Sequence, residues 1–265
     1  MPAFTFFNRQ FNLRPRTQDF VDRAGISNGS ETIVWNGLIR DIESDLVIDE
    51  ALSNGALFGM SPTCIGAIYH NLMNDTFILA NGTAPAFSIT GILFDGILQF
   101  LKTGIIPNTH LEINNSTVFC YIGNNVQSGG IPWGATQGAG QSYQGRPRSA
   151  ADIAIFTCYN NTTQMSGTST NASGYWFHSA IDANSRYIRR EGVDIANDDS
   201  TTIVGLQPTI EQYIGSRNSS GAANSFVPYE FRTWGQATKG LSKPKADILW
   251  GFLQTFNSKI IPGGR

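Results

Sequence analysis

From residue 55 onward, hydrophobic positions come in short runs of β-branched and aromatic residues. TVFCYI (117–122), AIFTCY (154–159) and YEFRTWG (229–235) are typical of these runs, and turn signals such as Asn-Gly, Asp-Gly and Gly-Gly separate them. Many short strands with such spacing are typical of a β-sandwich or jelly roll. The pattern therefore predicts a mainly β jelly-roll domain over residues 54–265, which includes a helix at its C-terminal end.

Two segments contain too few apolar residues to form a core, and we expect them to be long loops. They are 127–150, which includes GGIPWGATQGAGQSYQG, and 160–174. Glycine and small polar residues in clusters are typical of loops between strands.

Before residue 55 the period is helical. Ser30 can cap a helix whose apolar residues share one face and which fades at Ser53-Asn54-Gly55. We therefore expect a helical lead-in over residues 30–53. Residues 1–29 are expected to form an N-terminal arm with one helix-capable piece, TQDFVDRAG.

The chain ends with a second helical pattern, predicted over residues 242–261. Ser242 is the expected N-cap and Pro244 lies in the first turn, where its missing N–H costs nothing. A stripe of apolar residues at helical spacing must be buried against a sheet face, the helix at 31–52 or a second subunit. The expected packing anchors are Leu249, Phe252, Phe256 and Ile260.

Composition narrows the class of protein. Charged residues make up 14% of the chain, against about 25% in ordinary soluble domains, so Ser, Thr, Asn and Gly must cover much of the surface. A net charge of −2 gives no electrostatic footprint for nucleic acid. No segment is apolar enough to span a membrane, and the first residues lack the order of a signal peptide. We therefore expect synthesis in a cytoplasm, no membrane insertion and no nucleic-acid partner.

Three cysteines far apart in the chain form neither a disulfide framework nor a metal knuckle. Cys120 and Cys158 lie in apolar runs and are predicted as buried free thiols.

Four stretches in order resemble one known group of domains. They are SITGILFDGILQFLKTGIIPN (88–108), SGYWFHSAIDANSRYIRREG (173–192), YIGSRNSSGAANSFVPYEFRTWGQATKGLS (213–242) and the final helix with its Q-T-F-N and G-R. Together they resemble the concanavalin A-like (LamG-like) jelly rolls in structural proteins of tailed bacteriophages, in particular the crAss-like phages of Bacteroidetes. The resemblance covers residues 30–265 and none of the arm.

This resemblance implies a virion component that assembles in the host cytoplasm, such as a head fibre, decoration protein or tail or collar appendage. Its expected partners are other virion proteins, copies of itself and a bacterial surface glycan. The arm would then attach the chain to the particle. Its candidate attachment residues are Phe4, Phe6, Phe7, Phe11, Arg14 and Arg16.

Aromatic residues in a polar loop are candidates for stacking on sugar rings, with arginines to bond the hydroxyls. Trp133, Tyr143, Arg146 and Arg148 in segment 127–150 form this candidate glycan site. The alternative is that Trp133 pins the segment to its own domain or to a neighbouring subunit. Aromatic residues in strand-like runs are expected to pack in the core: Trp176, Tyr187 and Trp234.

Hydrolases of the concanavalin A-like fold carry carboxylates on one face of a strand, and ESDLVIDE (43–50) is the nearest such stretch. Its Glu43, Asp45 and Asp49 or Glu50 have the wrong spacing and lie in a helical pattern. We therefore expect a protein without catalytic residues. A stand-alone carbohydrate-binding module is the first alternative to a virion protein, and a glycan hydrolase or lyase the second.

No histidine has a second ligand at metal-binding spacing, so no cofactor or metal is expected. Calcium is the one alternative, because Asp198 and Asp199 supply oxygen atoms in a predicted turn.

Overall fold

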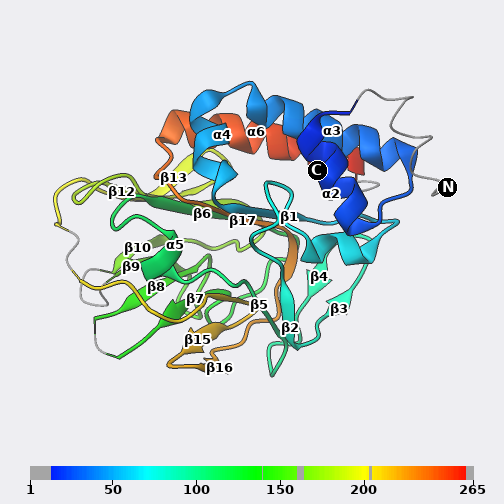
Figure 1. Ribbon diagram of the computed structural model, residues 1–265. Helices are drawn as coiled ribbons and strands as arrows, with labels where there is room; N and C mark the ends of the chain where they lie inside the picture. Colours follow the sequence, from blue (N-terminus) through cyan, green and yellow to red (C-terminus); the bar gives the residue numbers. More distant parts are fainter. Residues whose placement is uncertain (1–12, 139, 160–163, 203–204, 261–265) are drawn as a thin grey trace.

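A computed structural model describes residues 13–138, 140–159, 164–202 and 205–260 of the chain. Three layers are visible in Figure 1: a helical layer, a first sheet beneath it and a second sheet that faces the first. The predicted jelly-roll sandwich with a C-terminal helix is thus confirmed.

The first sheet contains eight strands within the described residues. In spatial order they are β13 (Val193–Asp198), β12 (Arg186–Arg190), β11 (Gly174–Ala180), β6 (Ser116–Ile122), β17 (Glu230–Ala237), β4 (Ile92–Leu93) and β3 (Ala86–Phe87), with β1 (Ala56–Gly59) also paired to β17.

The second sheet contains nine strands within the same residues. In spatial order they are β10 (Met165–Thr168), β9 (Ile153–Cys158), β8 (Ser142–Arg146), β7 (Trp133–Thr136), β14 (Tyr213–Ile214), β5 (Phe100–Lys102) and β2 (Ala80–Thr83), while β15 (Arg217–Ser219) pairs with β7 and with β16 (Ala222–Asn224). Pairing is antiparallel throughout except between β15 and β7.

Both faces of β6 and β11, at the centre of the first sheet, are buried, which explains why these two strands read as nearly continuous apolar runs. In β6, Val118 and Cys120 face the core between the sheets, whereas Phe119 faces the helices. In β11, Trp176 faces the core between the sheets, and Phe177 faces the helices. The predicted burial of the aromatic residues and of the two thiols is confirmed for Trp176, Tyr187, Trp234, Cys120 and Cys158.

The helical layer is built from both ends of the chain. It contains α2 (Pro15–Ala24), α3 (Gly29–Glu43), α4 (Leu46–Ser53) and α6 (Lys243–Ile260), and Figure 1 shows α3 and α6 lying side by side over the first sheet. Two short helices lie elsewhere, η1 (Ile65–Tyr69) and α5 (Pro107–His110). No helix of the described residues has the length and apolar character needed to cross a bilayer.

The C-terminal helix agrees with its prediction within one residue at each end. The Ser242 carbonyl accepts the first helical hydrogen bond from the Ala246 N–H at 2.9 Å, as an N-cap residue does. Leu249, Phe256 and Ile260 are buried, and Phe252 is partly buried. Of the proposed packing partners, α6 contacts both the upstream helix and a sheet face. The Phe256 ring lies 4.4 Å from that of Trp35 on α3, and the Leu253 carbonyl accepts a hydrogen bond from the Tyr175 hydroxyl of β11 at 2.8 Å.

The predicted N-terminal helix is wrong in two details. Its cap is Asn28 rather than Ser30, because the Asn28 side chain accepts hydrogen bonds from the Ser30 and Glu31 amides. It also breaks after Glu43, because the Asp45 side chain accepts from the Val47 and Ile48 amides and so starts α4.

The two predicted loops contain strands. Segment 127–150 holds β7 and β8, and segment 160–174 holds β10. Glycine is what permits this packing, since a Cβ at Gly145 would lie 2.2 Å from the Trp133 ring. A small residue on one strand thus makes room for a large one on the neighbouring strand. The low apolar content of the segment therefore leads to the wrong prediction of a loop.

Candidate functional site

The second sheet differs from the first because its outer face is polar. Strand pairing aligns one row of residues on this face and the alternate row toward the core. The outer row is Lys102, Tyr213, Gly134, Gln144 and Thr157, and the inner row is Leu101, Ile214, Trp133, Gly145 and Phe156. Alternation along β8 therefore turns Ser142, Gln144 and Arg146 outward.

The Ser142 and Gln144 side chains join with those of β7, β15 and β16 in one hydrogen-bonded network, and Arg146 lies beside it on β8. The Gln144 Oε1 atom accepts from Thr136 Oγ1 at 3.2 Å and from Arg217 Nη1 at 3.3 Å. Arg217 Nε donates to Asn224 Oδ1 at 3.1 Å. We call this set the polar face; it comprises Thr136, Ser142, Gln144, Arg146, Arg217 and Asn224.

Arg217 reaches Gln144 across an intervening strand. Arg217 lies on β15, on one side of β7, and Gln144 lies on β8, on the other side. Gly134, which pairs with Gln144, has no side chain to obstruct this path. The face is only partly open, because Gln144 is 5% exposed while Thr136, Arg146, Arg217 and Asn224 are half-buried.

The two arginines of the polar face have no acidic partner within 4.0 Å among the described residues. Arg146 Nη1 donates to the Gly129 carbonyl at 2.7 Å, and its buried Nε finds no acceptor in the same part of the chain. Burial lowers the pKa of Arg146, and the charge of Arg217 lowers it further. Burial also lowers the pKa of Arg217. Both groups remain cationic at neutral pH, since an arginine starts from a pKa above 12.

A shallow open groove of about 400 Å³ adjoins the polar face at Tyr213, which we call the Tyr213 groove. Its lining is Gly104, Ile106, Ile210, Glu211, Tyr213, Asn218 and Gly221. The Glu211 carboxylate accepts from the Gly104 N–H at 3.1 Å, and Asn218 Nδ2 donates to the Glu211 carbonyl at 2.8 Å. The Tyr213 ring packs on Phe100 at 4.7 Å. The walls are therefore fixed, and the volume lies in the range of small-ligand sites.

Of the predicted glycan residues, only Arg146 lies on the polar face. Trp133 and Tyr143 are strand residues with no exposed surface, and their rings pack together at 5.7 Å. The prediction that they stand in a loop is wrong, and a fully buried ring offers no face to a sugar. Trp133 packs within its own domain, the alternative stated above. Arg148 forms an ion pair with Asp152 at 2.7 Å.

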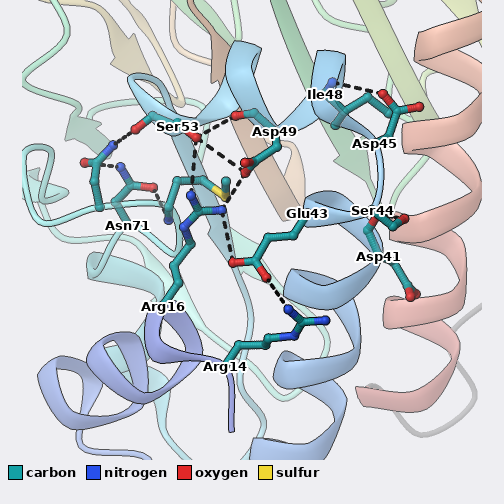
Figure 2. A network of polar contacts seen from close by, with 12 residues as sticks. Arg14, Arg16, Asp41, Glu43, Ser44, Asp45, Ile48, Asp49, Ser53 and Asn71 are labelled. Atoms are coloured by element: carbon teal, nitrogen blue, oxygen red, sulfur yellow. Dashed lines mark hydrogen bonds and ion pairs between the residues drawn. The ribbon is translucent and has the colours of Figure 1, made fainter.

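Glu43 and Asp49 lie on α3 and α4, and Asp45 lies between these helices; their contacts tie the helical layer together (Figure 2), while Glu50 pairs with Lys239. Arg16 Nη1 lies 2.6 Å from the Asp49 carboxylate and 3.7 Å from that of Glu43, which also lies 3.5 Å from Arg14. Asp45 caps α4 and accepts from Lys245 of α6 at 2.6 Å.

Figure 2 also shows where two of the proposed attachment residues lie, since Arg14 and Arg16 make these contacts from the start of α2. The four phenylalanines Phe4, Phe6, Phe7 and Phe11 lie outside the described residues. Helix α2 packs through Phe20, whose ring lies 4.8 Å from Trp35. The part of the predicted arm that is described is thus docked on the helical layer.

The proposed calcium residues take part in other contacts. Asp198 accepts from Arg186 Nη2 at 2.8 Å and from the Thr201 N–H at 2.9 Å, and Asp199 accepts from Ser185 Oγ at 2.7 Å. Burial raises the pKa of Asp198, but the hydrogen bonds from Arg186 and the loop amides outweigh it and hold the pKa well below its usual value. Within the described ranges, no three His, Cys, Asp or Glu residues are grouped to hold a metal ion.

Comparison with known proteins gives likeness of fold alone. No family model matches the chain, and no curated protein matches it in sequence. Among solved structures, a Trypanosoma rangeli sialidase mutant displaying trans-sialidase activity has a TM-score of 0.53 at 12% identity over 86% of this chain. A receptor binding domain has a TM-score of 0.52 at 12% identity over 81%. The binding domain of botulinum neurotoxin DC in complex with SialylT has a TM-score of 0.51 at 12% identity over 78%.

The matched part is a fraction of those structures, because this chain spans 39%, 53% and 52% of their respective lengths. At these identities the likeness establishes a shared jelly-roll architecture of the kind found in sialidases and in toxin binding domains. It does not carry over their ligands or reactions.

Proposed function

We propose that this chain is a non-catalytic, lectin-like module that binds a carbohydrate on the polar face and in the Tyr213 groove. The observation that carries the proposal is the difference between the outer faces of the two sheets. Helices bury the outer face of the first sheet, while that of the second sheet carries a half-buried polar network beside a groove of about 400 Å³. Amide, hydroxyl and guanidinium groups held in fixed positions suit sugar hydroxyls.

Likeness of fold to a receptor binding domain and to a botulinum neurotoxin binding domain in complex with SialylT supports a binding role. A binding role without catalysis also agrees with Glu43, Asp45 and Asp49, which form ion pairs with residues of α2 and α6. The alternative, a hydrolase or lyase of this fold, requires polysaccharide turnover that is lost on Glu43→Gln or Asp45→Asn substitution.

A glycan array with wild-type protein and two tryptophan variants tests the proposal. Ile210→Trp places a large ring in the groove and should abolish binding of every glycan that the wild type binds. Ile248→Trp is the matched control, since it alters an apolar residue of α6 that is 39% exposed, and it should bind as the wild type does. Equal binding by both variants would place the site elsewhere, and no binding by any of them would refute a lectin.

The more specific proposal is that the module belongs to a phage virion, as a head fibre, decoration protein or tail or collar appendage that adheres to host glycans. Its support is the ordered resemblance of 88–108, 173–192 and 213–242 to phage jelly rolls. The chain should then sediment with intact particles in a density gradient and form homo-oligomers in light scattering. Absence from purified particles would refute the virion assignment and leave the lectin proposal standing.

A further inference from the structure

The arginines of this protein fall into two groups, those that form an ion pair with a carboxylate and those that do not. Within the described residues, every arginine except Arg146, Arg190 and Arg217 forms an ion pair with a carboxylate. Arg190 is accounted for otherwise, because it donates to the Ser173 carbonyl and lies over the Trp176 ring at 6.0 Å. The two arginines left over lie together on the polar face.

Keeping two guanidinium groups there without a carboxylate is unfavourable in the free protein. Each is half-buried, and removing charge from water costs free energy unless a counter-charge compensates. The Arg146 Nε–H is buried with no acceptor among the described residues, and the like charge of Arg217 is near enough to lower the pKa of Arg146. A bound anion would compensate these two positive charges and remove the unfavourable free energy.

The contacts that these arginines do make orient them without neutralising them. Arg217 donates to the side-chain amide oxygens of Gln144 and Asn224, and Arg146 donates to a backbone carbonyl. All three acceptors are uncharged. The Nη2 groups of both arginines have no partner in the described part of the chain and are not among its buried unpaired atoms. Each arginine therefore offers a solvent-facing N–H group for a charge-assisted hydrogen bond.

We propose that the carbohydrate bound here carries an anionic group, a carboxylate or a sulfate ester, held jointly by Arg146 and Arg217 through their Nη2 groups. This inference rests on the proposed function, because it names the class of sugar bound at the same site. The neutral part of the saccharide extends over the half-buried Thr136 and Asn224 toward the Tyr213 groove.

A sugar fits better than a nucleic acid or a phosphopeptide. Polyanion binding draws on clustered Lys and Arg, whereas the chain has a net charge of −2 and the polar face supplies two cations. The groove beside them is lined by Glu211, a carboxylate that would repel a second anionic group one residue further along a polymer. The site thus suits one negative charge next to a neutral, hydroxyl-rich ring.

The test uses titration calorimetry with matched probes. The probes are an acidic oligosaccharide from the array, the same oligosaccharide with its carboxyl groups reduced to alcohols, and, for a sulfated hit, its desulfated form. The wild type should bind the acidic probe at least 10-fold more tightly than its neutral form. Its affinity should also fall as NaCl rises from 50 to 500 mM.

Arg146→Gln and Arg217→Gln should each lose about 10-fold or more in affinity for the acidic probe and little for the neutral one. Arg40→Gln is the control of equal charge change, because Arg40 is exposed on α3 and paired with Asp41. It should leave the affinity unchanged. Arg217→Lys keeps the charge but loses the planar fork, so it should fall between wild type and Arg217→Gln, and it serves if the glutamine variant does not fold.

Failure of this inference differs from failure of the proposed function. Equal affinity for acidic and neutral probes, unchanged in the arginine variants, would overturn the anion assignment and leave a neutral-sugar lectin. Absence of binding to any glycan would overturn both. Binding of inorganic sulfate as tightly as the acidic sugar, or of phosphopeptides in place of sugars, would overturn the assignment to a carbohydrate.

Discussion

The outer faces of the two sheets differ: helices cover that of the first sheet, and no helix of the described residues covers the polar face of the second. The first sheet turns Phe119 and Phe177 outward, and α3 and α6 bury them. The second sheet turns Gln144, Arg146 and Arg217 outward and leaves them without a helical cover. The protein itself covers one face, and the other carries a half-buried polar network.

Arginine pairing follows the same division. Arg186 and Arg189, on β12 of the first sheet, are 2% and 8% exposed and pair with Asp198 and with Asp194 and Asp247. Arg146 and Arg217 have only uncharged partners. Arg186 and Arg189 are thus compensated by carboxylates within the fold, whereas no carboxylate of the described residues compensates Arg146 or Arg217. Arg190, also on β12, donates to the Ser173 carbonyl and lies over the Trp176 ring.

The largest expected effect concerns the covered face. Leu249→Ala removes a fully buried side chain from between α6 and the first sheet, and it should lower the free energy of unfolding by about 3 kcal/mol, measured by urea titration. Ile248→Ala, one residue earlier and 39% exposed, should change it by less than about 0.5 kcal/mol. Similar losses from both variants would mean that the helix is not packed as described.

Removing one charge from each sheet tests the division of arginines directly. Arg186→Gln leaves Asp198 without its buried partner and should cost about 3 kcal/mol of stability. Arg217→Gln removes a half-buried charge with no counter-ion and should leave stability within about 0.5 kcal/mol of wild type, or raise it. If urea titration shows equal losses, the two groups of arginines do not differ in the way that we argue.

The core between the sheets supplies a pH-dependent test. His178 is fully buried among Trp133, Phe156 and Trp176, and burial lowers its pKa to about 3. The unfolded chain therefore binds a proton below its ordinary pKa of about 6.5 while the folded chain does not, so stability falls as pH falls. From this group alone the loss between pH 7 and pH 5 should be about 2 kcal/mol.

His178→Phe should flatten that dependence, and the difference between the two urea-unfolding profiles isolates the histidine from the carboxylates. Glycan affinity, in contrast, should be the same at pH 7 and pH 5, because Arg146 and Arg217 of the polar face stay charged over this range. An unchanged pH profile in His178→Phe would show that the folded protein protonates this imidazole as readily as the unfolded chain does, so that burial does not lower its pKa.

Sequence patterns predicted the parts of this fold whose cause is local. The run of short strands and the capped, striped final helix follow from turn chemistry and periodicity, and both are confirmed. The composition of segment 127–150 predicts a loop because its glycines mask a strand pair, in which Gly145 makes room for Trp133. The sequence does contain one strand signal in this segment. Along Ser142-Tyr143-Gln144-Gly145-Arg146, polar residues that face outward alternate with residues that face the core.

The candidate site was harder to predict because its residues come from distant segments. The sequence pattern indicates Arg146 but neither Arg217 nor Gln144, since β15 meets β7 only through long-range pairing. The absence of a carboxylate partner for an arginine is likewise a property of the folded chain, because the sequence does not show which arginine each Asp or Glu will pair with. The division between paired and unpaired charges therefore emerges only in three dimensions.

The smallest expected effect separates polar atoms that serve a ligand from those that merely remain unsatisfied. Thr157 stands beside Gln144 in the outer row, yet its Oγ1 atom is buried and has no partner among the described residues. Thr157→Val removes this hydroxyl at nearly constant volume and should raise the free energy of unfolding by up to about 1 kcal/mol. Because solvent does not reach the atom, glycan affinity should stay the same. Arg217→Gln should show the reverse, with stability kept and affinity lost. A Thr157→Val protein that binds its glycan more weakly would mean that the ligand reaches deeper into the second sheet than the two arginines.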